Sequence, residues 1–113
     1  MATKRQKKIE RLIQKEMGTI FQRKDPKSFR GRMITVTVVR ISPDLQIVKI
    51  YLSIYPSKDS EEIIQLVRED TSELRYELGN KIRNQVKKIP ELKFFIDDTL
   101  DYIDNIDNLL KED

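Results

Sequence analysis

Residues 33–56, MITVTVVRISPDLQIVKIYLSIYP, predict a β-hairpin. Val, Ile, Thr and Tyr are frequent in both halves of this stretch, and these residue types favour strands. Between the halves lies Ser42-Pro43-Asp44, where proline suits the first central position of a tight turn. The stretch therefore predicts two antiparallel strands joined by a short turn.

Alternation of side chains divides the predicted hairpin into two faces. The apolar face is expected to contain Ile34, Val36, Val38, Val48, Ile50, Leu52 and Ile54. The polar face is expected to contain Thr35, Thr37, Lys49, Tyr51 and Ser53. Because helical patterns flank the hairpin on both sides, we expect helices to cover the apolar face and leave the polar face open.

A long amphipathic helix is predicted over residues 3–22, before the hairpin. Apolar side chains recur there at steps of three and four residues and form one stripe: Ile9, Leu12, Ile13, Met17, Ile20 and Phe21. Residues 23–32 are predicted to form a loop, since Asp25-Pro26 and Gly31 break the pattern. Phe29 in this loop either packs against the domain or contacts a partner.

Two further helices and a third strand are predicted after the hairpin. Asp59 and Glu62 have the spacing of a capping box that opens the first of these helices. The helical pattern breaks near residues 70–72, resumes as Leu74, and is predicted to continue until Pro90. Residues 92–97 alternate as a strand. The predicted fold is α+β with the order α-β-β-α-α-β of the type II KH fold, in which three helices cover one face of a three-stranded sheet.

The chain of 113 residues is predicted to form one domain, 1–113, with residues 98–113 as a short acidic C-terminal extension. It has no cysteine and no histidine, which excludes disulfides and thiolate ligands and removes the commonest general base. Acidic residues gather near the C-terminus, at Asp97, Asp98, Asp101 and Asp104, without the spacing of a known metal loop. These acids are better interpreted as solvating a helix. We therefore expect a protein that is not an enzyme and has no metal or cofactor.

Charge is distributed unevenly along the chain. Residues 1–32 contain eleven Lys or Arg against three Asp or Glu, whereas residues 97–113 contain one Lys against seven acids. A basic N-terminal third favours a polyanionic partner, although solvated helix faces would also account for some of these charges. No apolar run approaches the ~20 residues of a membrane span, so we expect a cytoplasmic protein without membrane contact.

Nucleic-acid binding is the function that this composition favours, through phosphate contacts by lysine and arginine. The candidate RNA-binding residues are Lys4, Lys7, Lys8, Arg11, Lys15, Arg23, Lys24, Arg30, Arg32, Arg75, Lys81, Arg83, Lys87 and Lys88. Tyr51 and Tyr55 on the polar sheet face either stack on bases or simply cover the sheet. The GXXG loop with which KH domains clamp a nucleic-acid backbone is absent from the sequence.

Two motifs resemble the ribosome-binding factor A family. The first lies in the hairpin, as Thr35-Val36-Thr37, Ser42, Asp44-Leu45, Tyr51 and Ser53; the second is Pro90-Glu91-Leu92 with Phe94 and Asp97. The resemblance covers roughly residues 3–110. It implies a KH-like fold and a monomer that binds the free small (30S) ribosomal subunit and its 16S rRNA. It also implies a role in late rRNA maturation, including processing at the 5′ end, and importance during growth in the cold.

In this family a kink built on small residues replaces the GXXG loop, often before an aliphatic-Arg pair. Two alignments place that kink differently in this chain. One puts it at Ser72, before Leu74-Arg75, and the other at Gly79, before Ile82-Arg83. The first needs only a short insertion and is preferred. Two other functions remain open: a free-standing KH module for single-stranded RNA, and a protein-interaction domain.

Overall fold

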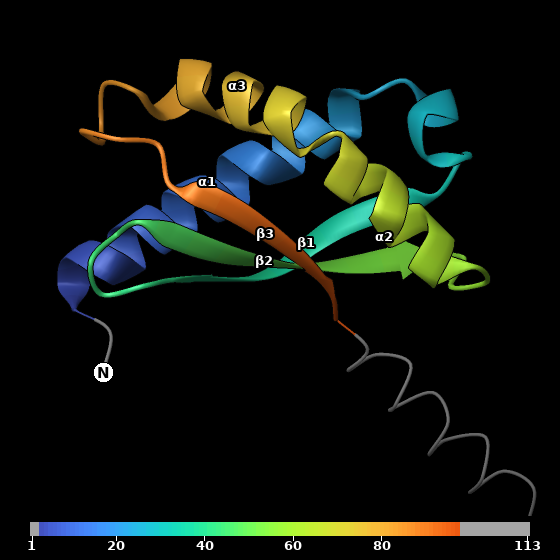
Figure 1. The fold of residues 1–113 in the computed structure, drawn as a ribbon, viewed down its shortest axis with the longest axis horizontal. Helices are drawn as coiled ribbons and strands as arrows, with labels where there is room; N and C mark the ends of the chain where they lie inside the picture. Colours follow the sequence, from blue (N-terminus) through green and yellow to red (C-terminus); the bar gives the residue numbers. More distant parts are fainter. Residues whose placement is uncertain (1–2, 98–113) are drawn as a thin grey trace, which may run out of the picture.

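The computed structural model describes residues 3–97, which form three helices on one face of a three-stranded sheet (Figure 1). The elements follow the predicted order. The bounds are α1 Lys4–Arg23, a short 3-10 helix Pro26–Phe29, β1 Met33–Ile41, β2 Ile47–Tyr55, α2 Ser60–Glu69, α3 Thr71–Ile82 and β3 Glu91–Ile96. The α+β fold class is therefore confirmed. The predicted extension, with Asp98, Asp101 and Asp104, lies outside the described residues.

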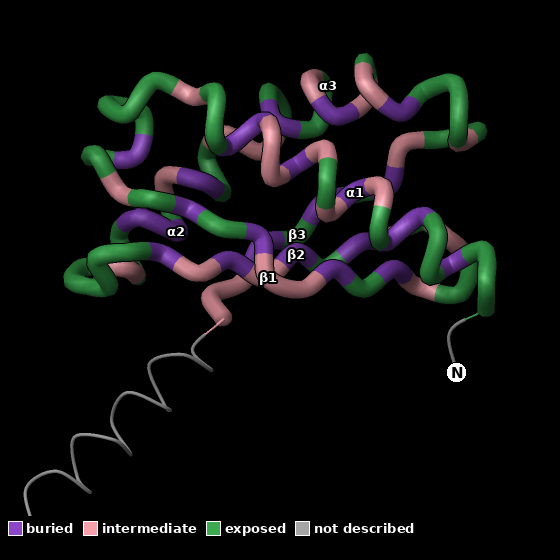
Figure 2. The backbone as a smooth tube through the Cα atoms, turned by 180° about the vertical axis from the view of Figure 1, so that it is seen from behind, coloured by how far each residue is buried: buried purple, intermediate pink, exposed green. Residues whose placement is uncertain are grey.

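The sheet has the strand order β1-β2-β3, with β1 and β2 antiparallel and β2 and β3 parallel. The turn lies where the sequence predicted it, because the Leu45 amide donates to the Ser42 carbonyl at 2.9 Å and Leu45 adopts a left-handed conformation. α1 packs along β1, α3 packs on α1, and α2 packs along β3 (Figure 1). Buried residues alternate with exposed ones along each strand, so the core lies between the sheet and the helices (Figure 2).

A β-bulge in β1 corrects one predicted face. The register passes from Val36 opposite Leu52 to Val38 opposite Tyr51, so one extra residue, Thr37, interrupts the pairing. Beyond the bulge Val39 and Ile41 point into the core, and Val38 does not. The prediction that Val38 shares a face with Val36 is therefore wrong.

The end of α3 differs from the prediction. The helix ends at Ile82, eight residues before Pro90, and residues 83–90 turn back along it. This return path depends on Gly79, because a Cβ built there would lie 3.3 Å from the Ile89 side chain. Ile89 continues the helical spacing in sequence but packs onto α3 from a separate segment. Periodicity alone could not separate these two arrangements.

Three local predictions are also decided by the structure. The capping box at Asp59 is absent, because Asp59 is in a left-handed conformation that makes no side-chain cap, and the Glu62 carboxylate pairs with Arg30 instead. Phe29 packs in the core, where its ring centroid lies 5.9 Å from that of Phe21. The helix break lies at Asp70, which is both the C-cap position of α2 and the N-cap position of α3, without a side-chain hydrogen bond to α3. That position agrees with the alignment at Ser72 and not with Gly79.

Candidate nucleic-acid interface

The N-terminal half of α1 presents a row of cations to solvent. Thr3 opens the helix with a capping box, in which its hydroxyl accepts from the Gln6 amide and the Gln6 side chain accepts from the Thr3 amide. The opposite stripe is buried, with Ile13 and Met17 fully covered. The exposed cations on this half are Lys4, Arg5, Lys7, Lys8, Arg11 and Lys15.

Three polar side chains fix α1 against the edge of the sheet. Gln6 donates to the Ile41 carbonyl at 3.3 Å, and the Glu10 carboxylate accepts from the Ile41 amide at 2.9 Å. Gln14 donates to the Thr37 carbonyl at 3.2 Å, beside the bulge. Sequence analysis missed these residues. Their spacing of four is the signal that could have found them, because it places all three on one helix face beside an edge strand.

A groove runs between this half of α1 and the segment that follows α3. One hollow of about 580 Å³ is lined by Arg5, Lys8, Ile9, Arg11, Leu12, Lys15 and Gln85. A neighbouring hollow of about 220 Å³ shares Arg5 and Ile9 and adds Lys87 and Lys88. We define the basic groove by its six cations: Arg5, Lys8, Arg11, Lys15, Lys87 and Lys88. Five of them were predicted to bind RNA, and Arg5 was not.

The segment carrying Lys87 and Lys88 is held by α3. The Arg75 guanidinium donates to the Pro90 carbonyl at 3.0 Å and to the Ile89 carbonyl at 2.5 Å. Pro90 is buried, whereas Lys87 and Lys88 are exposed. Asp44 also lines this end of the groove, and hydrogen bonds from the Ser42 hydroxyl and the Gln46 amide lower the pKa of its carboxyl. Arg75, a predicted RNA contact, is thus engaged in placing two others.

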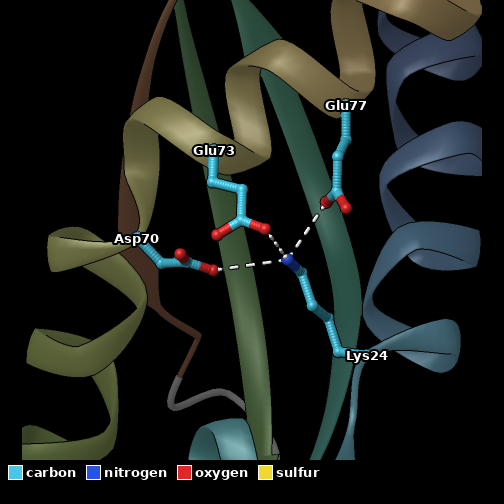
Figure 3. Close-up of polar contacts among 4 residues, drawn as sticks. All are labelled: Lys24, Asp70, Glu73 and Glu77. Atoms are coloured by element: carbon cyan, nitrogen blue, oxygen red, sulfur yellow. Dashed lines mark ion pairs between the residues drawn. The ribbon is translucent and has the colours of Figure 1, made fainter.

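Lys24 follows the C-terminal end of α1, whereas the basic groove lies along the N-terminal half of this helix, and Lys24 is surrounded by acids (Figure 3). Its ammonium is 3.1 Å from Glu77, 3.5 Å from Asp70 and 3.5 Å from Glu73, and its side chain is only 13% exposed. The cluster joins the end of α1 to the α2–α3 junction. Burial opposes the charge of Lys24, but the hydrogen bond to Glu77 and the three carboxylate charges together raise its pKa.

The remaining predicted RNA-binding residues are dispersed. Two of them form ion pairs: the Lys81 ammonium lies 3.7 Å from the Glu16 carboxylate, and the Arg30 guanidinium lies 2.7 Å from the Glu62 carboxylate. The Arg32 guanidinium donates to the Lys58 carbonyl at 3.1 Å. Arg23 shares a hollow with Lys24 and Glu77. Three others are exposed outside the basic groove: Lys4, Lys7 and Arg83. Residues 3–97 contain no cluster of three or more side chains able to hold a metal ion, and no helix among them is long and apolar enough to cross a membrane.

The cluster around Lys24 gives a prediction about stability. One cation serves three carboxylates, and burial together with the neighbouring Glu73 raises the pKa of Asp70 despite Lys24. A raised carboxyl pKa means that ionisation of Asp70 is costly in the folded state. This cost appears as the pH rises above the usual pKa of an aspartate carboxyl. At pH 7 we expect Glu77→Gln to lower the free energy of unfolding by about 1 kcal/mol, and Asp70→Asn to leave it unchanged or raise it. Urea unfolding of both variants measures this, and a larger loss for Asp70→Asn would contradict it.

Comparisons with known proteins identify the relatives of this chain. The family model of ribosome-binding factor A matches residues 5–110. Ribosome-binding factor A of Christiangramia forsetii is 44% identical over 110 residues, which cover 96% of this chain and 84% of that protein. The protein of the same name from Cytophaga hutchinsonii is 44% identical over 112 residues, with 99% and 84% covered.

Solved structures share the fold. The crystal structure of ribosome-binding factor A from Thermus thermophilus matches with a TM-score of 0.68 at 20% identity, over 80% of this chain and 94% of that one. A homology model of the Thermus thermophilus factor, fitted into a cryo-EM map of a 30S complex, matches with a TM-score of 0.64 at 20% identity, with 80% and 92% covered. At this identity the two matches support the fold alone.

Proposed function

The chain belongs to the ribosome-binding factor A family, and we propose that it binds the free small ribosomal subunit through the basic groove. The observation that carries this proposal is the groove itself. Cations from α1 and from residues 87–88, which are far apart in sequence, line two neighbouring hollows that share Arg5 and Ile9. Such an arrangement suits the phosphate backbone of folded RNA, because phosphate contacts position a protein without reading bases.

The proposed mechanism uses binding energy and no covalent chemistry. A protein that binds one arrangement of rRNA more tightly than another shifts the population toward the first. In this way the factor would favour late maturation of the small subunit, including processing at the 5′ end of 16S rRNA, and would matter most in the cold. The site of action would be the cytoplasm. Family membership supports these finer points, and the basic groove supports RNA contact.

Sedimentation of ribosomal particles tests the proposal. After mild lysis, we expect the protein to co-migrate with free small subunits and to be absent from complete ribosomes. Raising the salt concentration should release it, because phosphate contacts are screened. A protein that stays at the top of the gradient at every salt concentration, or that follows complete ribosomes, would contradict the proposed function.

A further inference from the structure

The face of the sheet opposite the helices is open to solvent. Among residues 3–97 no helix packs on it (Figures 1 and 2). Met33 is 67% exposed and Tyr55, its partner in the register, is 70% exposed. We call this surface the open face. The basic groove lies on the other side of the sheet, among the helices, so the two surfaces are separate.

Three cations form a row across the open face. The register places Arg40 opposite Lys49, and Lys49 opposite Lys93, so one cation comes from each strand. Neighbouring strands lie about 4.8 Å apart, and like charges directly opposite one another are destabilising. All three side chains are exposed, and none forms an ion pair with another described residue. An anionic ligand would relieve this repulsion.

Two aromatic rings lie in the next row of the same face. Tyr51 and Phe95 are register partners, and their rings stack with centroids 5.5 Å apart at an interplanar angle of 29°. The Arg68 guanidinium lies 6.0 Å from the Phe95 centroid and is held there by two hydrogen bonds to the Phe94 carbonyl. A flat, half-exposed aromatic pair thus adjoins the row of cations.

A further hollow shares one cation with the basic groove and one with the open face. A hollow of about 450 Å³ at the edge of β1 is lined by Lys7, Glu10, Arg11, Gln14, Val39 and Arg40. Arg11 also lines the basic groove, and Arg40 begins the row of cations. One polyanion could therefore follow both surfaces around this edge.

We propose that the open face binds an unpaired stretch of RNA, with phosphates along Arg40, Lys49 and Lys93 and a base on the Tyr51–Phe95 pair. This inference rests on the proposed function for the choice of RNA as the polyanion. An acidic protein segment would also pair with the cations, but the ring pair favours a flat ligand, since nucleobases stack on aromatic side chains. Stacking tolerates any base, so binding is expected to show little sequence preference.

Fluorescence anisotropy with a labelled twelve-nucleotide uridine RNA tests this proposal on the full chain. Lys49→Gln/Lys93→Gln should weaken binding about tenfold and reduce the slope of log K against log salt by about 1.4, since each contact to a single strand contributes about 0.7. Phe95→Leu should weaken binding at least fivefold and leave the slope unchanged. The control Lys27→Gln/Lys58→Gln removes two exposed cations outside both surfaces and should bind as the parent does.

Two further measurements separate the outcomes. Lys8→Gln/Lys87→Gln tests the basic groove: loss of uridine binding in this variant alone would overturn the second surface and leave the proposed function standing. The second measurement uses a synthetic peptide with the sequence of residues 98–113, which carries six acids against one lysine. If Lys49→Gln/Lys93→Gln abolished binding of this peptide but not of the RNA, the open face would be a site for acidic protein segments and the proposal would be wrong.

Discussion

Val36→Asp is expected to unfold the domain or lower its free energy of unfolding by several kcal/mol. Val36 is 7% exposed and lies opposite Leu52, whose side chain is fully buried. A carboxylate at this position would lose its hydration without gaining a partner. Domains of this size have roughly 5–15 kcal/mol of stability in total, so the loss is a large share of it. A thermal melt followed by circular dichroism measures the effect.

Lys49→Asp, on the neighbouring strand, is the matched control. Lys49 is exposed on the open face between Arg40 and Lys93, so the new carboxylate would lie between two cations. Opposite charges on adjacent strands contribute about 0.2–1 kcal/mol, so we expect the melting temperature to stay the same or rise slightly. A folded Val36→Asp beside an unfolded Lys49→Asp would mean that the sheet faces had been assigned the wrong way round.

Much of this fold was predictable because its local patterns agree with its tertiary packing. The hairpin alternates with period two and its turn residues suit the turn that forms, while the α1 stripe repeats with the period of a helix. The alternation predicted over residues 92–97 is also present, since Leu92 and Phe94 are buried while Lys93 is exposed. In each case one segment carries both the pattern and the face that it buries.

The bulge in β1 was not predicted by the alternation of side chains. Uninterrupted alternation from Ile34 through Val36 and Val38 would have placed Arg40 in the core, where a guanidinium is costly to bury. The extra residue, Thr37, moves Arg40 to the open face and brings Ile41 into the core. Unbroken alternation would also have exposed the apolar Ile41 while burying the charged Arg40. This conflict was the signal in the sequence that could have predicted the bulge. Arg40 joins Lys49 and Lys93 on the open face only because of this shift.

The candidate interface was only partly predictable for a different reason. Exposed cations on α1 follow from the helical pattern, but the position of Lys87 and Lys88 depends on where α3 ends. That depends on Gly79, which leaves room for Ile89, and on Arg75, which binds two carbonyl groups of the returning segment. Likewise, the three acids around Lys24 come from the α2–α3 region and become neighbours only in the folded chain. The sequence shows how many such charges there are, but it does not show which of them form ion pairs.

Neutralising the basic groove is expected to have the largest effect on function. The variant Lys8→Gln, Arg11→Gln, Lys15→Gln and Lys87→Gln removes four cations of the basic groove, three from one of its hollows and Lys87 from the neighbouring one. Each phosphate contact releases a counterion when the complex forms, and this release favours binding. Because the variant loses these contacts, its affinity for the small subunit should fall about a hundredfold near physiological salt. The slope of log K against log salt should become shallower by about 3–4. This figure takes roughly 0.9 for each lost phosphate contact, the value for duplex DNA, as the value for duplex RNA.

Stability and charge number are the controls for this last prediction. All four side chains are exposed, and no described residue forms an ion pair with them, so the melting temperature should change little. Lys27→Gln/Lys58→Gln removes two cations outside the groove, and the resulting change in log K should be far less than half of that in the groove variant. If both variants lost affinity in proportion to the charges removed, net charge alone would explain binding, and the groove would have no special role. Equal affinity of the groove variant and the parent at two salt concentrations would exclude the groove as the binding surface.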